Sequence, residues 1–414
     1  MASTVRKREP VAFGISPKMA RALADTWRFR ILVEVTVKPL SPSQFVKHFG
    51  GDLSQVSRSF RQLAEWGYLK VIEERPGQRG GASVEHVYEA IRRAHFDTAA
   101  WEKVSSSGRH AVSYSILSSY FQRVREALEN GTFDQEMDRH LSWDAVALDR
   151  PAWEQINKRL DEVLASLTEL ESKASDCISN TKVETIPTIV GLMAFRSPQS
   201  PAQMLQAPRR HKGPTNPSDP GSSFGIGSKL AKALSNKWRC RILMEVSIRP
   251  LSPSQFVEEV GGSISHISRC FRELAQWGYV DLIEERRGGR HGGGVERVYR
   301  STCRPYFDTP TWETLPRLLR EEVSQFFLDS YLAHVSEAIE AGTFDVEIDR
   351  HLSWKPLLLN RSTWKEIGET LDAILAWLPD LEAESIERTK EEVDQLIPTI
   401  VGLTSFRSAE HLTS

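Results

Sequence analysis

The stretch that decides the fold is SPSQFVKHFGGDLSQVSRSFRQLAEWGY at residues 41–68, and it returns as SPSQFVEEVGGSISHISRCFRELAQWGY at residues 252–279. Its start, Ser41-Pro42-Ser43-Gln44, combines an N-cap serine, a proline in the first helical turn and a glutamine placed for a capping box. This pattern predicts a helix from Pro42 to about Phe49. Gly50-Gly51 ends that helix, so a tight turn and a second helix are expected next.

The second helix is expected from about Leu53 to Trp66, because its apolar residues recur at helical spacing. Val56, Phe60 and Leu63 share one face of it. At about 100° per residue the opposite face carries Ser54, Arg58 and Arg61, with Gln55, Ser57 and Gln62 beside them. Gly67 stops the helix.

Outward from this core, one amphipathic helical segment precedes and two strands follow. Residues 17–37 have apolar side chains at helical spacing, interrupted once, which indicates two helices. Residues 68–73 and 85–90 have the composition of strands, on either side of a glycine-rich turn at residues 76–81. Helices, turn, helix and hairpin in this order are typical of a winged helix.

The whole arrangement occurs twice. Residue n aligns with residue n+211, without a gap, from Gly14 and Gly225 to Ser197 and Ser408, which indicates a duplicated module of domain size. A segment with six prolines, Pro198 to Phe224, reads as a linker. The predicted division is therefore a winged helix at 14–97, an accessory region at 98–197, the linker at 198–224, a second winged helix at 225–308 and a second accessory region at 309–408.

Each accessory region is expected to be mainly helical. A long amphipathic helix follows each wing, with apolar side chains from Val112 to Leu128 and from Val323 to Ile339. We expect it to pack copy one against copy two, although packing within its own copy is the alternative. Strands at 141–148 and 186–195 flank a helix at 151–178. The predicted fold class is α+β, mainly α, with a small β element in each accessory region.

Charge is segregated along the chain although the net charge is only −2. Residues 14–97 hold 13 Lys or Arg and 9 Asp or Glu, a net charge of +4, and residues 225–308 hold 14 and 9, a net charge of +5. Residues 98–197 have a net charge of −4, and residues 309–408 one of −10. Positive charge on the winged helices favours binding of a nucleic-acid backbone there.

The residue types on the second helix suit the major groove of double-stranded DNA, where Arg and Gln read base edges through paired hydrogen bonds. Basic residues of the wing suit phosphates or the minor groove. The alternative, an ordinary solvated helix face, is less favoured because the pattern occurs twice. The predicted DNA-binding residues are Ser54, Gln55, Ser57, Arg58, Arg61 and Arg79 in copy one, and Ser265, His266, Ser268, Arg269, Arg272, Arg287 and Arg290 in copy two.

These stretches resemble ArsR-type winged helix-turn-helix repressors over about 80 residues of each copy. The resemblance rests on Trp27-Arg28-Phe29-Arg30-Ile31-Leu32, Ser43-Gln44-Phe45, Ser57-Arg58-Ser59-Phe60 and Trp66-Gly67-Tyr68. The region after each wing resembles the C-terminal extension of some actinobacterial members. Metal-sensing members carry paired cysteines near the recognition helix, whereas here Cys270 stands alone. The resemblance thus implies DNA binding without a metal.

Other chemistry is poorly supported by the sequence. The four cysteines are far apart, at 177, 240, 270 and 303, which argues against a disulfide framework or a zinc site. The repeated Asp138-Arg139-His140-Leu141-Ser142-Trp143 brings together residue types of catalytic sites, but no nucleophile elbow, phosphate loop or dinucleotide motif accompanies it. We expect a structural role for it. Trp101, Tyr120, Trp143 and Trp153 are expected in the core, with the lining of an effector pocket as the alternative.

The sequence is therefore interpreted as a cytoplasmic, non-enzymatic transcriptional regulator that binds double-stranded DNA as a single-chain pseudo-dimer. No cofactor and no membrane segment are expected. A small-molecule effector and further self-association stay open. The main alternative is a protein-interaction scaffold that keeps the winged-helix fold without DNA binding, and an enzyme with a winged-helix appendage is the weaker one.

Overall fold

The computed structural model describes residues 25–37, 39–76, 84–91, 101, 104–180, 184–205, 233, 236–287, 295–302, 312, 315–390 and 392–409. These residues form a mixed α+β structure with antiparallel sheets. The chain divides into two compact units. The first comprises residues 1–127 and 408–414, and the second comprises residues 128–407. The division into five parts expected from the sequence stays a prediction.

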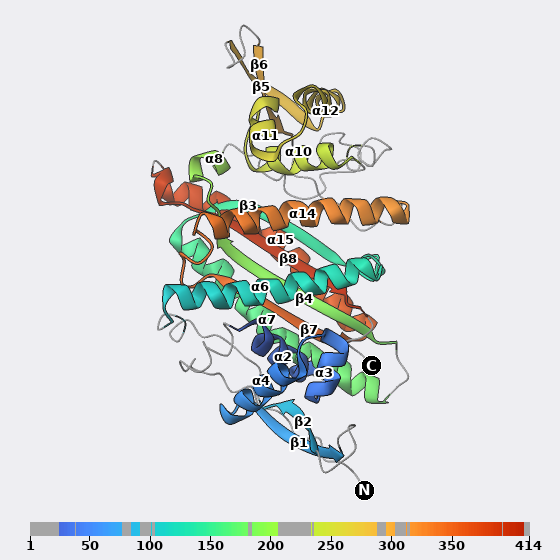
Figure 1. Cartoon of the computed structure of the whole chain (residues 1–414). Coiled ribbons are helices and arrows are strands. Elements are labelled where there is room, and N and C mark those ends of the chain that lie inside the picture. Colours follow the sequence, from blue (N-terminus) through green and yellow to red (C-terminus); the bar gives the residue numbers. More distant parts are fainter. Residues whose placement is uncertain are drawn as a thin grey trace. The chain divides into compact units, whose positions relative to one another are not determined.

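The first unit contains three helices, a hairpin and a long helix. They are α2 (Thr26–Val37), α3 (Pro42–Phe49), α4 (Leu53–Glu65), β1 (Leu69–Pro76), β2 (Val84–Ala90) and α6 (Ser106–Glu129) (Figure 1). The predicted capping box is confirmed: the Ser41 side chain accepts from the Gln44 backbone N–H, and the Gln44 side chain accepts from the Ser41 backbone N–H. The expected helical residues before Asp25 and the glycine-rich turn after Pro76 lie outside the described residues.

The second unit repeats this order in copy two. It contains α10 (Lys237–Ile248), α11 (Pro253–Val260), α12 (Ile264–Gln276), β5 (Val280–Arg287), β6 (Val295–Ser301) and α14 (Arg317–Glu340). The capping box recurs at Ser252 and Gln255. Each hairpin is antiparallel and has a register shift at the same place, between Val71 and Glu73 and between Leu282 and Glu284. Identical local signals therefore give identical local structure.

A four-stranded antiparallel sheet lies at the centre of the second unit, and it mixes the two copies. Its strands are β3 (His140–Leu148), β4 (Ile186–Arg196), β7 (His351–Leu359) and β8 (Ile397–Arg407), in the order β3-β8-β4-β7 (Figure 1). The outer strand of each copy pairs with the inner strand of the other copy. The inner strands pair with Leu192 opposite Leu403, which are equivalent residues of the two copies, so a pseudo-twofold axis passes between them.

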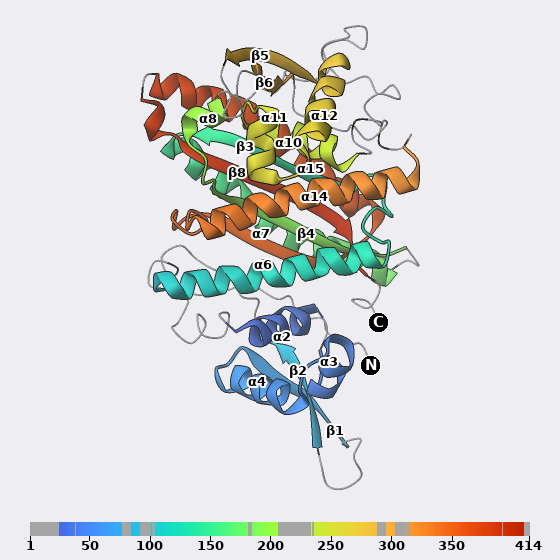
Figure 2. The same ribbon diagram turned by 45° about the horizontal axis from the view of Figure 1, so that its top comes forward.

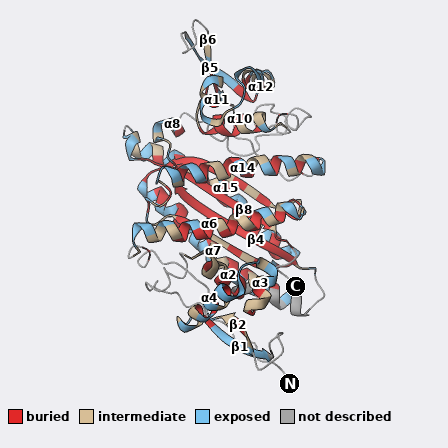
Figure 3. Ribbon diagram, in the orientation of Figure 1, coloured by how far each residue is buried: buried red, intermediate tan, exposed pale blue. Residues whose placement is uncertain are grey.

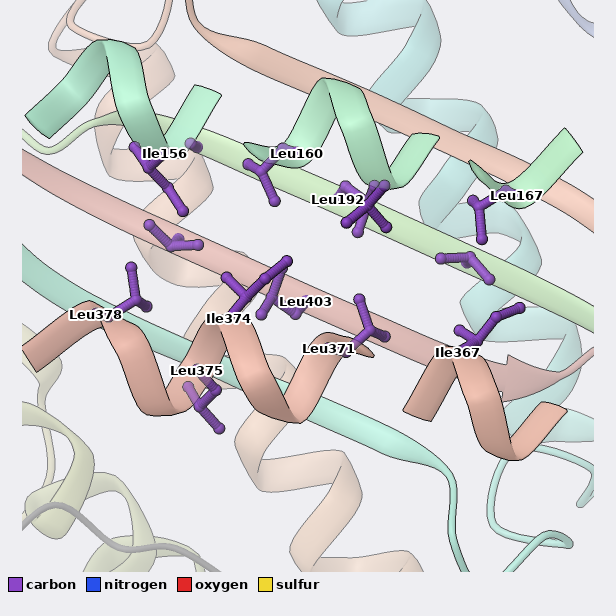
Figure 4. Packing of buried hydrophobic residues seen from close by; sticks show 14 of the residues in the cluster. Ile156, Leu160, Leu167, Leu192, Ile367, Leu371, Ile374, Leu375, Leu378 and Leu403 are labelled. Carbon is purple, nitrogen blue, oxygen red and sulfur yellow. The ribbon is translucent and has the colours of Figure 1, made fainter. Parts of the chain in front are cut away.

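Two long helices cover one face of this sheet. Helix α7 (Arg150–Asn180) packs on β7 and β4, and α15 (Arg361–Thr389) packs on β3 and β8. Their leucines and isoleucines meet those of the inner strands in one buried cluster (Figure 4). Both inner strands are buried along almost their whole length (Figure 3). Because each helix rests on strands of both copies, residues 140–196 and 351–407 form a single core.

Helix α14 packs on α10 of its own copy and lies against strands of the other copy (Figure 2). Its Tyr331 donates a hydrogen bond to the Met193 sulfur of β4 at 3.0 Å, and its Phe327 packs against Trp143 of β3 with ring centroids 5.9 Å apart. Tyr331 also lies against Gly402, where an added Cβ would collide with the phenol ring and its hydroxyl. These contacts join α14 of copy two to strands of copy one, as expected for this helix. The same expectation for α6 stays a prediction.

One expectation needs correction. A small, separate β element is expected in each accessory region. Instead, each copy contributes one strand of 9 residues and one of 11 residues to a single shared sheet. The apolar run IPTIVGL suits a strand that is buried on both faces and flanked by strands on both sides. Helix α8 (Pro201–Leu205) lies within the segment expected to be a linker and buries Met204. The 3₁₀ helix η1 (Val393–Gln395) precedes β8 and contacts α8.

Candidate nucleic-acid interface

Helices α4 and α12 carry most of the predicted DNA-binding residues, each on the face turned away from its own core. The buried faces hold Val56, Phe60 and Leu63 in α4, and Ile267, Phe271 and Leu274 in α12. On the opposite faces, Ser57 and Ser268 are half-buried, and the other predicted residues are exposed: Ser54, Gln55, Arg58 and Arg61, and Ser265, His266, Arg269 and Arg272. The structure thus brings five predicted residues together on each helix.

The four arginines of these faces keep their charge available to a ligand. Among the residues that the structure describes, none of the four has a carboxylate partner within ion-pair distance. Arg61 Nε lies 3.4 Å from the Ser57 carbonyl oxygen, and Arg272 Nε lies 3.2 Å from the Ser268 carbonyl oxygen, so each guanidinium is tethered to its own helix. Arg58 and Arg269 point from the middle of the exposed face.

The neighbouring arginines of α2 and α10 are used differently. Arg28 donates to the Gln62 side chain at 3.1 Å and lies over the Trp66 ring at 5.3 Å. Arg239 makes the same two contacts in copy two, with Glu273 at 2.8 Å and with Trp277 at 5.2 Å. These residues fasten the first helix to the end of the third and are not part of the exposed face.

Two glycines set the angle between α3 and α4. Gly50 and Gly51 have φ of +74° and +102°, a conformation in which an L side chain is strained. A Cβ on Gly51 would come within 2.7 Å of the Trp27 ring. In copy two, Gly262 has φ of +103° and a Cβ there would lie 3.0 Å from the Trp238 ring. The turn therefore requires glycine because of both its backbone and its close packing.

The hairpins supply less free positive charge than the sequence suggested. Arg79 and Arg290 lie outside the described residues, and Arg287 is the last residue of β5, with only its backbone described. Arg286 forms an ion pair with Glu284 at 2.7 Å, and this hydrogen bond raises the pKa of the Arg286 guanidinium. Arg75 pairs with Glu73 in the same way. In the described strands, basic side chains are thus partly neutralised by carboxylates.

A serine–glutamate contact that sequence reasoning missed fixes each hairpin to the helix that precedes α4 or α12. Ser41 Oγ donates to Glu85 Oε1 at 2.6 Å, and Ser252 Oγ donates to Glu296 Oε1 at 2.6 Å. Each serine is also the N-cap of its helix. The signal was present as the repeated glutamate 44 residues after each capping serine, but its partner is visible only in the folded chain.

The exposed faces of α4 and α12 differ in charge and hydrogen-bonding groups. The N-cap residue of α4 is Asp52, whose carboxylate accepts from the Gln55 backbone N–H at 2.9 Å. The N-cap residue of α12 is Ser263, whose side chain makes no capping hydrogen bond. His266 replaces Gln55, and its Nε2 lies 3.7 Å from the sulfur of Cys270. The faces are therefore similar in position but not identical in chemistry.

The repeated Asp-Arg-His-Leu-Ser-Trp segment links the copies through structural contacts. His140 Nε2 lies 2.6 Å from Ser142 Oγ, and its Nδ1 lies 3.2 Å from Asp372 of α15. His351 repeats this with Ser353 and Asp161. Each histidine thus connects its own strand with the other copy's helix, as a structural role requires.

Within the described ranges, no group of three or more His, Cys, Asp or Glu side chains is placed to hold a metal ion. Cys240 is buried in the core of copy two, where burial raises the pKa of its thiol to about 12. Burial also raises the pKa of the Cys270 thiol. Trp101, Tyr120 and Trp153 are buried, and Trp143 is half-buried.

Comparison with known proteins adds no family: no family model matches the chain, and no curated protein matches it. Of the helices described, none combines the length and apolar character needed to cross a membrane.

Proposed function

We propose that this protein is a sequence-specific double-stranded DNA-binding transcriptional regulator. In this proposal, residues 14–97 and 225–308 are winged helix-turn-helix domains of the ArsR type, and the chain acts in the cytoplasm as a single-chain pseudo-dimer. The observation that carries the proposal is the repeated exposed face of small polar and cationic side chains on α4 and α12.

Helix α4 in copy one and α12 in copy two would enter the major groove. An arginine there donates two hydrogen bonds to guanine, and a glutamine pairs in the same way with adenine. The half-buried serines and the tethered arginines Arg61 and Arg272 are suited to phosphates beside the groove. Each hairpin, held by its serine–glutamate contact, would meet the backbone or the minor groove as the wing does in winged helices.

The shared sheet supports the pseudo-dimer. Strands of both copies alternate in it and the inner pair is related by a pseudo-twofold axis, so the two accessory regions cannot separate without breaking the core. Because Asp52 and Gln55 in copy one correspond to Ser263 and His266 in copy two, we propose that the two DNA half-sites differ in sequence. A homodimer of single modules would instead favour identical half-sites.

The second candidate is an interaction scaffold without DNA binding, and the carboxylates paired with Arg75 and Arg286 on the hairpins favour it. The arginines on both recognition faces, which have no carboxylate partner in the described part of the chain, favour the DNA binder. An enzymatic function has less support, because the histidines of the repeated segment are used in contacts between the copies.

A salt titration of binding to mixed-sequence duplex DNA tests the proposal. The affinity should fall steeply with salt, because bound protein releases counterions from the phosphates. Replacing Arg58, Arg61, Arg269 and Arg272 by Ala should weaken binding strongly and reduce the slope of the logarithmic plot by about 1 for each phosphate that is no longer neutralised. Arg159→Ala is the matched control, because Arg159 lies on α7 and pairs with Glu162. Equal binding by both variants would contradict the proposal.

A further inference from the structure

The helix that leads into each recognition unit is joined to the following long helix by a buried ionic cluster. In copy one, Arg123 of α6 forms an ion pair with Glu34 of α2 and another with Glu126 at 2.9 Å. Arg30 of α2 pairs with Glu126 at 3.3 Å. Burial lowers the pKa of Arg123 to about 10, so this residue stays cationic at neutral pH. The joint of copy one therefore holds a permanent charge.

Copy two has a histidine at the position of that arginine. His334 of α14 is 1% exposed, and its Nδ1 lies 3.2 Å from Glu337 Oε2. Its Nε2 faces Glu245 of α10, with 3.9 Å between Nε2 and Oε1. Glu245 and Glu337 are the equivalents of Glu34 and Glu126, and Arg241 is the equivalent of Arg30. The cluster of copy two therefore contains the same two carboxylates as that of copy one, with an imidazole in place of the arginine.

The charged groups around His334 come from α10, its C-cap and α14. Arg241 pairs with Glu245 at 2.8 Å, and Arg249 also acts on Glu337. Burial raises the pKa of the Glu337 carboxyl, but the His334 hydrogen bond and the charges of His334, Arg241 and Arg249 outweigh this, and the net shift is downward. Trp143 of β3 packs on the imidazole with ring centroids 5.0 Å apart. His334 thus meets two carboxylates and an aromatic ring of copy one.

The two protonation states of His334 fit this joint unequally. The imidazolium donates from both nitrogens and carries the charge that Arg123 supplies in copy one. His334 Nε2 and Glu245 Oε1 are buried and have no hydrogen-bond partner among the described residues, so at 3.9 Å they attract each other only through the charge of the imidazolium. Arg241 Nε lies 2.8 Å from Glu245 Oε1, but this ion pair does not have the geometry of a hydrogen bond. The attraction between His334 and Glu245 across the joint is therefore present only while the imidazole carries its proton.

We propose that His334 makes the joint between α10 and α14 sensitive to pH. Histidine is the side chain whose charge ordinarily changes between about pH 5 and 8. On the acid side of this range the imidazolium holds α10 on α14. As the pH rises, the proton is released to solvent and the attachment of the second winged-helix unit loosens. The joint of copy one, built on Arg123, does not respond. This proposal stands whether or not the protein binds DNA.

Hydrogen exchange of the full-length protein between pH 5.5 and 8, corrected for the intrinsic pH dependence of exchange, tests this. Protection of α10 and of the facing part of α14 should fall about tenfold as the pH rises, the size expected for one charge-assisted hydrogen bond, whereas α2 should show no such fall. His334→Arg, which restores the residue of copy one, should keep α10 protected throughout. Arg123→His should transfer the pH dependence to α2.

His334→Gln covers the case in which the arginine is too large for the buried position. This neutral variant should show the lower protection at every pH. A fall in α10 protection that persists unchanged in His334→Gln, or protection in the native protein that does not vary with pH, would overturn the proposal.

Discussion

The indole nitrogen of Trp364 in α15 donates a hydrogen bond to Asp138 of the other copy, with 2.9 Å between Nε1 and Oδ1. The equivalent pair, Trp153 and Asp349, makes the same bond at 2.9 Å. Arginines complete the arrangement: Arg361 pairs with Glu136, and Arg150 pairs with Glu347. The first turn of the long helix of each copy thus contacts the turn that precedes the first strand of the other copy. The same contacts therefore occur twice, once from each copy to the other.

Removing either carboxylate of these pairs should destabilise the shared core. Asp138→Ala leaves the Trp364 N–H without its partner in a site where the tryptophan is 2% exposed, at an expected cost of about 1–2 kcal/mol in the free energy of unfolding. Asp349→Ala should cost a similar amount, because Trp153 is equally buried. Denaturant unfolding measures both, and Glu322→Ala on the exposed face of α14 is the control. Costs at the level of the control would show that the contacts do not fasten the core.

The pair Asp149–Arg388 should make stability depend on pH. Its hydrogen bond, 2.6 Å between Arg388 Nε and Asp149 Oδ2, lowers the pKa of the Asp149 carboxyl. The folded state therefore binds this proton less readily than the unfolded state. The contribution is complete above the ordinary aspartate pKa, about 3.9, and is lost as the pH falls through the lowered value.

Asp149→Asn should consequently reduce stability at pH 7 by about 1 kcal/mol, a figure that allows for the 40% exposed Arg388 side chain. Thermal unfolding from pH 7 down to pH 3 should show the difference from the native protein shrinking with acidification. A constant difference would show that Asp149 does not act through its charge.

The turn before α4 and the turn before α12 should tolerate no side chain at their second glycine. Gly51→Ala combines positive φ with an approach to Trp27 and should cost about 2–4 kcal/mol. Gly67→Ala has a comparable φ of +79° but open space around its Cβ, and should cost about 1 kcal/mol. The same contrast is expected between Gly262→Ala and Gly278→Ala, since only Gly262 lies against a ring. Urea unfolding of the four variants compares them, and equal losses within each pair would show that backbone strain alone decides.

The serine–glutamate contacts should matter for binding more than for stability, if the proposed function is correct. Glu85→Gln and Glu296→Gln keep the size of the side chain but weaken the contact that positions the hairpin. We expect each change to reduce DNA affinity severalfold with a stability loss below about 1 kcal/mol. Glu74→Gln, at an exposed position of β1, is the control. Unchanged affinity would show that the hairpin needs no such support.

The sequence predicted the local elements well and the pairing of the copies poorly. Helix α3 and its capping box follow from residues within one turn of each other, and so does the stop at Gly50. The partner of β3 lies more than 200 residues away. Since both copies carry the same strand pattern, a strand has equal sequence reasons to pair within its copy or across copies. The choice is made by tertiary packing, which the sequence pattern does not contain.

The candidate site was predicted in the same uneven way. Helical periodicity alone placed Arg58 and Arg269 on the exposed face of their helices. The ion pair that neutralises Arg286 and the contact between Ser41 and Glu85 depend on how side chains are oriented in the folded chain, so their geometry became visible only there. The role of His334 could not be predicted for a related reason. It depends on comparison with Arg123, whose ion pairs are visible only in the folded chain.

The central claim is that α4 and α12 read two different DNA half-sites, and selection of binding sites from random duplex DNA tests it most directly. The intact protein should enrich a two-part motif whose halves are not identical. Arg58→Ala should weaken the base preference in one half of the motif, and Arg269→Ala should weaken it in the other half. The double variant should lose the motif at the same salt concentration. Failure of the intact protein to enrich any motif, with affinity equal to that of the double variant, would contradict the account and favour the interaction scaffold.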